Sequence, residues 1–169
     1  MREATGSSWT FKLIIVFIFL FSTFLVLTIN YSKSYRVKNE VLSILEKYEG
    51  FTNDNNTNSN SKTIIDNYLK NSGYKETGNC PVENNAPYYY GVTDLSTGEV
   101  LQVSNNDKYY YCLKQNVNGD GTMFYQLILF YHFSLPFLGS IRNYQVTGTT
   151  ENIIYNKKNN NYVINGNGG

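Results

Sequence analysis

Charged side chains are scarce in this chain of 169 residues: they make up 16% of it, and the formal net charge is only +1. Lys and Arg are scattered along the chain, and their densest pair is Lys157 and Lys158. Proteins that bind nucleic acids electrostatically show a basic face or stripe. The composition therefore predicts that this protein has no nucleic-acid partner.

Residues that usually carry catalysis or bind metals are also few. His132 is the single histidine, and no Cys-x-x-Cys or His-x-x-x-His spacing accompanies it, so we expect a structural histidine and no zinc-type site. The sequence has no Gly-x-Ser-x-Gly motif and no phosphate-binding glycine loop. We therefore predict that the protein is not an enzyme and has no catalytic residue, no cofactor, no metal ion and no small-molecule substrate.

One segment has a partial likeness to a calcium-binding loop. Residues Asn116–Gly121 provide the oxygen ligands and the glycine of the first half of an EF-hand loop. The twelfth position of that loop needs a bidentate glutamate, and here it is Leu127. We interpret Asn118–Gly121 as a hairpin turn.

Cysteine is limited to Cys80 and Cys112. A bond between them would close a loop of about 33 residues and would stabilise the fold by about 3–4 kcal/mol in the chain-entropy model. Such a bond persists in an oxidising compartment. We predict a disulfide between Cys80 and Cys112; the alternative is two buried, unpaired thiols.

What the sequence has in abundance is a long apolar run near its start. Residues Leu13–Ile29 contain no charge, and with Phe11 and Lys12 the run reaches 19 residues, close to the roughly 20 that cross a bilayer as a helix. It is longer than the roughly 7–15 apolar residues of a cleaved signal peptide, and no small-x-small cleavage site follows it. We predict an uncleaved, single-pass signal-anchor in a bacterial cell membrane.

The features that determine the orientation of this anchor point in opposite directions. Lys33, Arg36 and Lys38 follow the span and outnumber the cations before it, so the positive-inside rule alone favours a cytoplasmic C-terminal part. The two cysteines and the short flank favour the opposite orientation. We therefore predict four segments: a cytoplasmic flank (1–12), a transmembrane helix (13–29), an extracytoplasmic α+β domain (30–154) and a disordered tail (155–169).

The helical pattern continues beyond the apolar run. Val37, Val41, Ile44 and Tyr48 recur at helical spacing, and no Pro or Gly occurs between Ser7 and Glu49. The pattern predicts one helix of roughly 40 residues that ends at Gly50 as a C-cap. The alternative is two helices with a break near Asn30.

The remaining chain predicts a second helix and a small sheet. After a polar loop (52–61) with a formal glycosylation sequon at 55–57, we expect a helix over Lys62–Ser72, with Ser61 as N-cap and Gly73 as C-cap. Alternating patterns and turn sequences then predict antiparallel strands at 88–94, 99–104, 108–115, 122–134 and 142–153. The fold class is α+β: a long N-terminal helix packed on a small antiparallel sheet of four to five strands.

The strand at 122–134 is apolar on both faces, so it is either central and covered on both sides or presents one face to a partner. The connection that follows, 135–139, reads as an exposed apolar turn.

The chain resembles type IV pilins, and among them the minor, TadE-like pseudopilins of tight-adherence (Flp/Tad) pili. The resemblance lies in Arg2-Glu3 and Gly6-Ser7-Ser8 before the apolar run, in the unbroken helix to Glu49, and in the strand–turn–strand sequence FYQLILFYHFSLPFLGSIRNYQVTGTT. The chain departs from the family at Phe11, which lies five positions after Gly6, where pilins typically carry glutamate. This departure leaves processing by a prepilin peptidase open.

The resemblance implies a membrane-anchored cell-envelope protein that assembles into a pilus or a secretion-type complex. Its partners would be the lipid bilayer and other single-span pilin-like or assembly proteins. The alternative is a stand-alone extracytoplasmic ligand-binding or sensor module. Such a module would use Tyr88, Tyr90, Tyr109 and Tyr111 as a stacking platform, in a chain with 16 Tyr residues.

Overall fold

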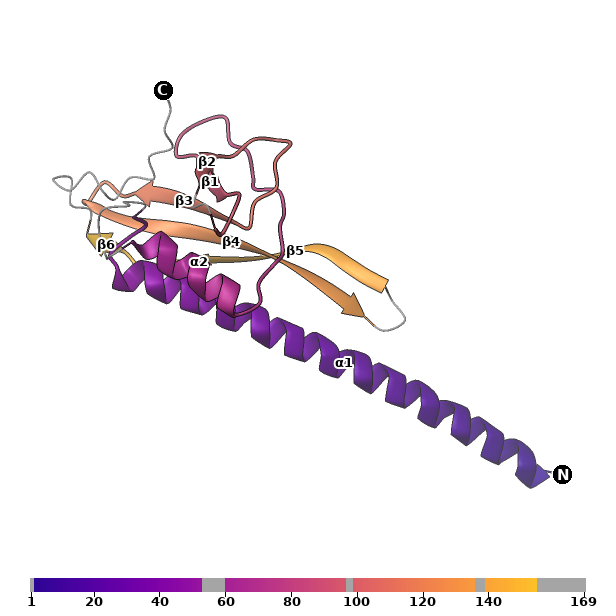
Figure 1. Cartoon of the computed structure of the whole chain (residues 1–169). Helices are drawn as coiled ribbons and strands as arrows, with labels where there is room; N and C mark the ends of the chain where they lie inside the picture. Colours follow the sequence, from indigo (N-terminus) through magenta and orange to yellow (C-terminus); the bar gives the residue numbers. More distant parts are fainter. Residues whose placement is uncertain (1, 53–59, 97–98, 136–138, 155–169) are drawn as a thin grey trace.

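The computed structural model describes residues 2–52, 60–96, 99–135 and 139–154. The predicted disordered tail, the sequon, most of the polar loop and residues 136–138 of the predicted apolar turn (135–139) lie outside these residues, whereas Leu135 and Gly139 belong to strands. One long helix extends from a small domain in which a second helix and a sheet pack against its C-terminal half (Figure 1). The predicted α+β class is confirmed.

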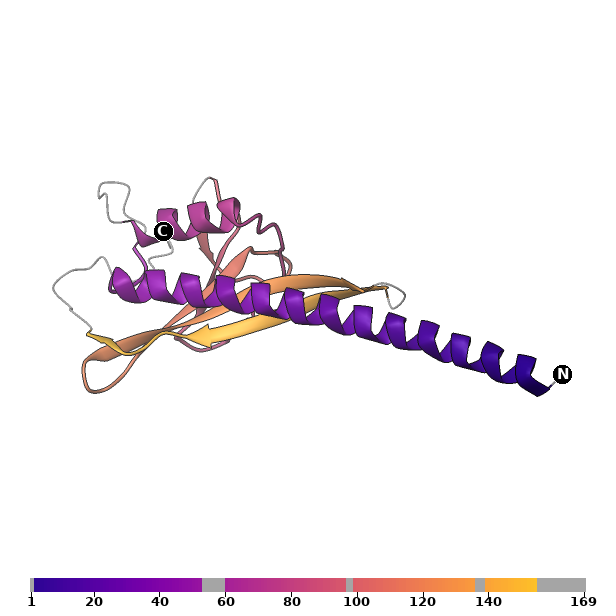
Figure 2. The ribbon, with the colours of Figure 1, turned by 90° about the horizontal axis from the view of Figure 1, so that it is seen from below.

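Helix α1 spans Arg2–Lys47 without interruption, so the expectation of one continuous helix is correct and the alternative break near Asn30 is absent. The two halves of α1 have different surroundings. Large apolar side chains from Trp9 to Ile29 are exposed, whereas Val37, Val41 and Leu45 are buried in the domain. The second half of α1 therefore provides the central core element, and the first half extends away from it (Figure 2).

The end of α1 differs from the expected Gly50 cap by one residue. Glu49 takes the left-handed conformation, with a φ of 54°, and its N–H donates to the carbonyl of Glu46. The N–H of Gly50 donates to the carbonyl of Leu45 at 2.8 Å. This pair of bonds is a Schellman motif in which a glutamate occupies the position that usually favours glycine.

Helix α2 spans Ser61–Asn71, and its N-cap is Asn60 rather than the expected Ser61. The side-chain oxygen of Asn60 accepts from the N–H of Thr63. Ser61 is fully buried and its hydroxyl accepts from the N–H of Thr52 at 2.8 Å, which ties the start of α2 to the start of the preceding loop. At the other end, Gly73 has a φ of 72° directly after the C-cap Ser72, close to the expected position.

The sheet has six antiparallel strands. Five of them follow the order β2-β1-β3-β4-β5, and β6 pairs with β4 beside β5. The bounds are β1 Tyr89–Val92, β2 Val100–Gln102, β3 Tyr111–Val117, β4 Thr122–Leu135, β5 Gly139–Thr149 and β6 Ile153–Ile154. Each predicted strand has a counterpart, and the prediction of four to five strands is one short because the last predicted strand is divided.

The division between β5 and β6 has a local cause. Thr150 is buried, and its hydroxyl accepts from the N–H of Tyr125 at 2.9 Å, in the place of a main-chain acceptor. The N–H of Glu151 then donates to a carboxylate oxygen of Glu46 on α1 at 2.8 Å. These side-chain bonds interrupt the regular ladder along β4, as a bulge does.

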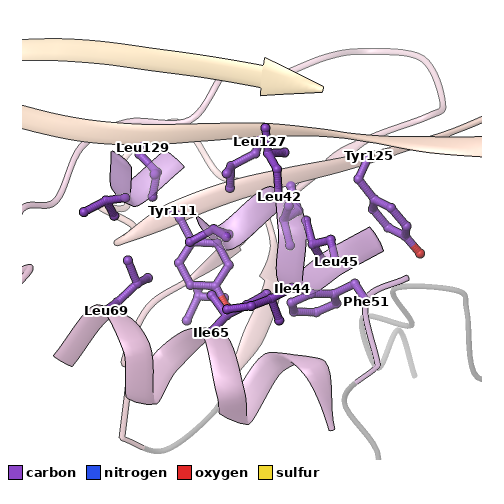
Figure 3. Close-up of a cluster of buried hydrophobic side chains, with 14 of the residues drawn as sticks. Leu42, Ile44, Leu45, Phe51, Ile65, Leu69, Tyr111, Tyr125, Leu127 and Leu129 are labelled. Carbon is purple, nitrogen blue, oxygen red and sulfur yellow. The ribbon is translucent and has the colours of Figure 1, made fainter. Parts of the chain in front are cut away.

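Strand β4 is central, and both of its faces are covered between Leu127 and Tyr131. On one face Tyr125, Leu127 and Leu129 pack against α1 and α2 in the main hydrophobic cluster (Figure 3). On the other face Ile128 and Phe130 belong to a smaller cluster. The first of the two sequence interpretations of this strand is therefore correct.

Candidate functional site

The smaller cluster contains the predicted disulfide. Cys80 and Cys112 are bonded, with an S–S distance of 1.99 Å and a Cα–Cα distance of 5.9 Å. Both cysteines are buried beside Phe130 and Tyr109, and Gly78 approaches the ring of Phe130 so closely that a Cβ there would overlap it. The disulfide therefore fixes the loop after α2 over the second face of the sheet.

A group of three polar side chains, not predicted from the sequence, lies between α2 and the sheet. Lys62 and Asp66 form an ion pair one helical turn apart, and both are almost completely buried. The hydroxyl of Tyr111 on β3 donates to Asp66 Oδ1 at 2.9 Å. The only sequence signal was the Lys-x-x-x-Asp spacing beside Ile65 and Leu69.

Electrostatics in this group follow from its burial. Loss of hydration raises the pKa of the Asp66 carboxyl, while the neighbouring Lys62 ammonium and the Tyr111 hydroxyl oppose that rise. Burial and the charge of Asp66 also raise the pKa of Tyr111. Since all three groups are enclosed by protein, we interpret the group as a polar link that positions α2 on the sheet.

Tyr74 makes a second unpredicted polar link. Its hydroxyl donates to the carbonyl of Tyr110 and accepts from the N–H of Phe130, both at 2.8 Å. The register of β3 and β4 ends at Tyr111 and Leu129, so the next pair would be Tyr110 and Phe130. The Tyr74 hydroxyl therefore bridges the two main chains at the point where β3 and β4 separate.

A small cavity of about 110 Å³ lies beside this point, where the end of α2 meets the middle of α1. His132 on β4 contributes to its wall and pairs with Glu76, and both side chains are partly exposed. Lys33 and Lys75 add two cations. The remaining lining residues are Asn30, Val37, Ser72, Gly73, Tyr74 and Tyr131.

Several ionisable side chains line this open space: Lys33, Lys75, Glu76 and His132. Its chemistry suits a small polar or anionic group, because two lysines and one histidine accompany a single carboxylate. In the part of the chain that the structure describes, no three His, Cys, Asp or Glu side chains are grouped so as to hold a metal ion.

The aromatic platform expected for a ligand-binding module is not assembled. Tyr109 and Tyr111 are fully buried, so neither ring has a free face for stacking. Tyr88 and Tyr90 are only partly exposed. The sequence pattern could not separate these roles because a tyrosine that alternates along a strand suits a core and a contact surface equally.

The largest exposed apolar surface belongs to α1. Over Trp9–Lys47 this helix is long and apolar enough to cross a membrane, with a mean hydropathy of 2.6 in its most apolar window, and none of that window is buried. Within the apolar run Leu13–Ile29, the three hydroxyl side chains, Ser22, Thr23 and Thr28, donate to carbonyls one turn earlier. Such bonds satisfy the hydroxyls within the helix, as an apolar environment requires.

Comparison with protein-family models, with curated protein sequences and with solved structures finds no match to this chain.

Proposed function

We propose that the protein is a membrane-anchored, pilin-like or pseudopilin-like component of the cell envelope that acts by assembly. In this proposal the first half of α1 crosses the membrane and the domain lies on the extracytoplasmic side. Neighbouring single-span proteins pack against the apolar helix and against the domain.

The observation that carries the proposal is the dual use of α1. The same unbroken helix exposes its apolar residues up to Ile29 and buries Val37, Val41 and Leu45 in the core of the domain. A simple tether would need only a flexible link between anchor and domain. A continuous helix fixes the position and rotation of the domain relative to its anchor, which an ordered assembly of identical or related subunits requires.

The disulfide supports the extracytoplasmic placement. Cysteine pairs such as Cys80–Cys112 are maintained in oxidising compartments and are rare in a reducing cytosol.

In-cell crosslinking tests the assembly. A photoreactive amino acid at Phe17 or Phe21, both exposed on α1, should give discrete adducts with other single-span membrane proteins. The same reagent at Asn67, which is exposed on α2, reports separately on packing of neighbours against the domain. If the positions on α1 form no protein adduct while the protein is present in the membrane, assembly through the anchor is wrong.

The cavity beside His132 favours the second candidate, a stand-alone extracytoplasmic ligand-binding or sensor module. Lys33, Lys75 and the Glu76–His132 pair could orient a small polar ligand there. A screen of small anions and glycans against the detergent-solubilised full chain would test it. Saturable binding that Lys33→Ala abolishes, without any crosslinked partner, would favour the sensor over the assembly.

A further inference from the structure

The end of the β4–β5 hairpin extends beyond the rest of the sheet. Pairing of β3 with β4 ends at Leu129, whereas pairing of β4 with β5 continues to Leu135 and Gly139. We call residues 132–135 and 139–143 the hairpin arm. The hairpin runs alongside α1 toward the N-terminal end of that helix in both views (Figures 1 and 2).

Two contacts nearer the core show which residues of α1 the hairpin lies beside. Gly148, the register partner of Leu127, lies against Leu42 and Lys38. Four residues further along β4, the hydroxyl of Tyr131 donates to the carbonyl of Ser34 at 3.4 Å. Four residues on β4 thus correspond to about four to eight residues on α1, since a strand rises more per residue than a helix.

The same ratio places Leu135, four residues beyond Tyr131, at the level of Val26–Asn30. This level includes the last residues of the apolar run, which ends at Ile29.

The exposure of α1 supports this level independently. Within the apolar half of the helix nearly every side chain is exposed, but Thr23, Val26 and Asn30 are half-buried. These three positions lie on the helical face that continues into the buried residues Ser34 and Val37. That face of α1 is therefore less exposed than its other faces beyond the end of the compact domain.

The sequence of the hairpin arm is unusual for a segment that extends into water. Three large apolar residues, Phe133, Leu135 and Ile141, occur within it. Arg142 is the single residue with a formal charge, taking histidine as neutral.

We propose that the hairpin arm is a second membrane contact, inserted into the interfacial layer of the leaflet from which α1 emerges. The occupant of this surface is lipid. The inference rests on the proposed function, because it takes residues 13–29 as the span. Val26 lies three residues inside the end of that span, a depth of about 5 Å, which is typical of interfacial segments.

Main-chain hydrogen bonding limits how deep the arm goes. Over the hairpin arm, the part of the sheet that the structure describes has no strand on the outer edge of β4 or of β5. Unpaired N–H and C=O groups are costly in the hydrocarbon core, so the arm stays among the lipid headgroups and the first methylene groups.

Tryptophan fluorescence tests the contact in the full chain. The single native tryptophan, Trp9, is first replaced in a Trp9→Phe background. Leu135→Trp then reports on the arm, Leu20→Trp on the span, and Leu101→Trp on β2, whose side chain is exposed at the far edge of the sheet. Each variant is placed in phosphatidylglycerol–phosphatidylcholine vesicles that carry bromine on the acyl chains, and its disulfide is checked as a measure of folding.

Strong quenching of Leu20→Trp and Leu135→Trp, with none of Leu101→Trp, is the expected result. Quenching of Leu20→Trp alone overturns the membrane contact of the arm and leaves the anchor intact. No quenching of Leu20→Trp overturns the proposed function itself. If Leu135→Trp does not form the disulfide, Ile141→Trp on the opposite strand replaces it under the same criteria.

Discussion

Asp66 is a carboxyl group held away from water between a helix and a sheet, with Lys62 as its partner on the same helix. Removing one member of a buried ion pair leaves the other charged and unpaired, which costs about 3–5 kcal/mol. We expect Asp66→Ala to lower the free energy of unfolding by that amount, measured by denaturant unfolding of the full chain in detergent micelles.

The control for this prediction removes both charges. Lys62→Met combined with Asp66→Leu keeps the volume apolar and should restore most of the lost stability. If the double variant is as unstable as Asp66→Ala, the loss comes from packing rather than from the unpaired ammonium.

Glu49 has a left-handed backbone conformation that favours glycine over a residue with a side chain. At a φ of 54° a side chain crowds the main chain, whereas glycine does not. Because the Glu49 side chain is exposed, Glu49→Gly should raise the free energy of unfolding by about 1 kcal/mol. The same change at the helical, partly buried Glu46 should lower stability, and equal effects at the two positions would contradict the argument.

Three buried tyrosines predict a loss of stability at alkaline pH. Burial raises the pKa of Tyr74, of Tyr111 and of Tyr131 above the ordinary value of about 10. In the unfolded chain these phenols ionise first, so the unfolded state binds fewer protons and stability falls as pH rises.

Their contribution is fully present below pH of about 10 and is lost progressively above it. Thermal unfolding measured at increasing pH, with phenolate absorbance recorded in parallel, should show these tyrosines ionising only as the domain unfolds. Ionisation of every tyrosine before unfolding would contradict the burial of their hydroxyls.

The buried group of Lys62, Asp66 and Tyr111 could not be predicted from the sequence, and the N-cap of α2 was predicted one residue away from its position. Lys62 and Tyr111 are far apart in the chain, so their meeting depends on how α2 docks on β3, which no local pattern encodes. The disulfide was predictable because two cysteines allow one pairing. Asn60 replaced Ser61 as N-cap because the Ser61 hydroxyl is bound to Thr52.

At the scale of elements, prediction was most successful where hydrophobic pattern and uninterrupted sequence agree. Helix α1 followed from its apolar run, its helical stripe and the absence of Pro and Gly between Ser7 and Glu49. Strand β4 followed from its two apolar faces. The split between β5 and β6 was missed because it depends on the tertiary bonds of Thr150 and Glu151.

Continuity of α1 gives a prediction at this scale. Ser32→Pro removes one main-chain hydrogen bond and kinks the helix between the span and the domain, at a cost of about 3 kcal/mol. The buried stripe begins at Ser34, so the domain should still form its disulfide and remain in the membrane. The crosslinks from Phe17 should be lost or change partners.

Ser32→Ala is the matched control because Ser32 is exposed and alanine keeps the helix intact. Unchanged crosslinking in Ser32→Pro would show that a rigid connection between anchor and domain is not required.

At the scale of the whole molecule, the domain covers only one half of its longest element, and the uncovered half is the apolar one (Figure 1). The smaller hydrophobic cluster, on the second face of the sheet, contains the Cys80–Cys112 disulfide. We expect Cys80→Ser with Cys112→Ser to lower the free energy of unfolding by about 3–4 kcal/mol.

Denaturant unfolding with and without reductant measures this effect. Reductant should destabilise the native chain and leave the double variant unchanged. A native chain that is indifferent to reductant would mean that the bond adds nothing to the stability of the domain.

The same disulfide limits how far the chain extends under mechanical load. Cys80 and Cys112 are separated by 32 residues, so about 110 Å of contour length is withheld from stretching when the chain is pulled from its two ends. The withheld segment includes β1 and β2, whereas β4 and β5 lie outside it. Under tension the domain would therefore extend only in part and keep a covalently closed remnant from which to refold.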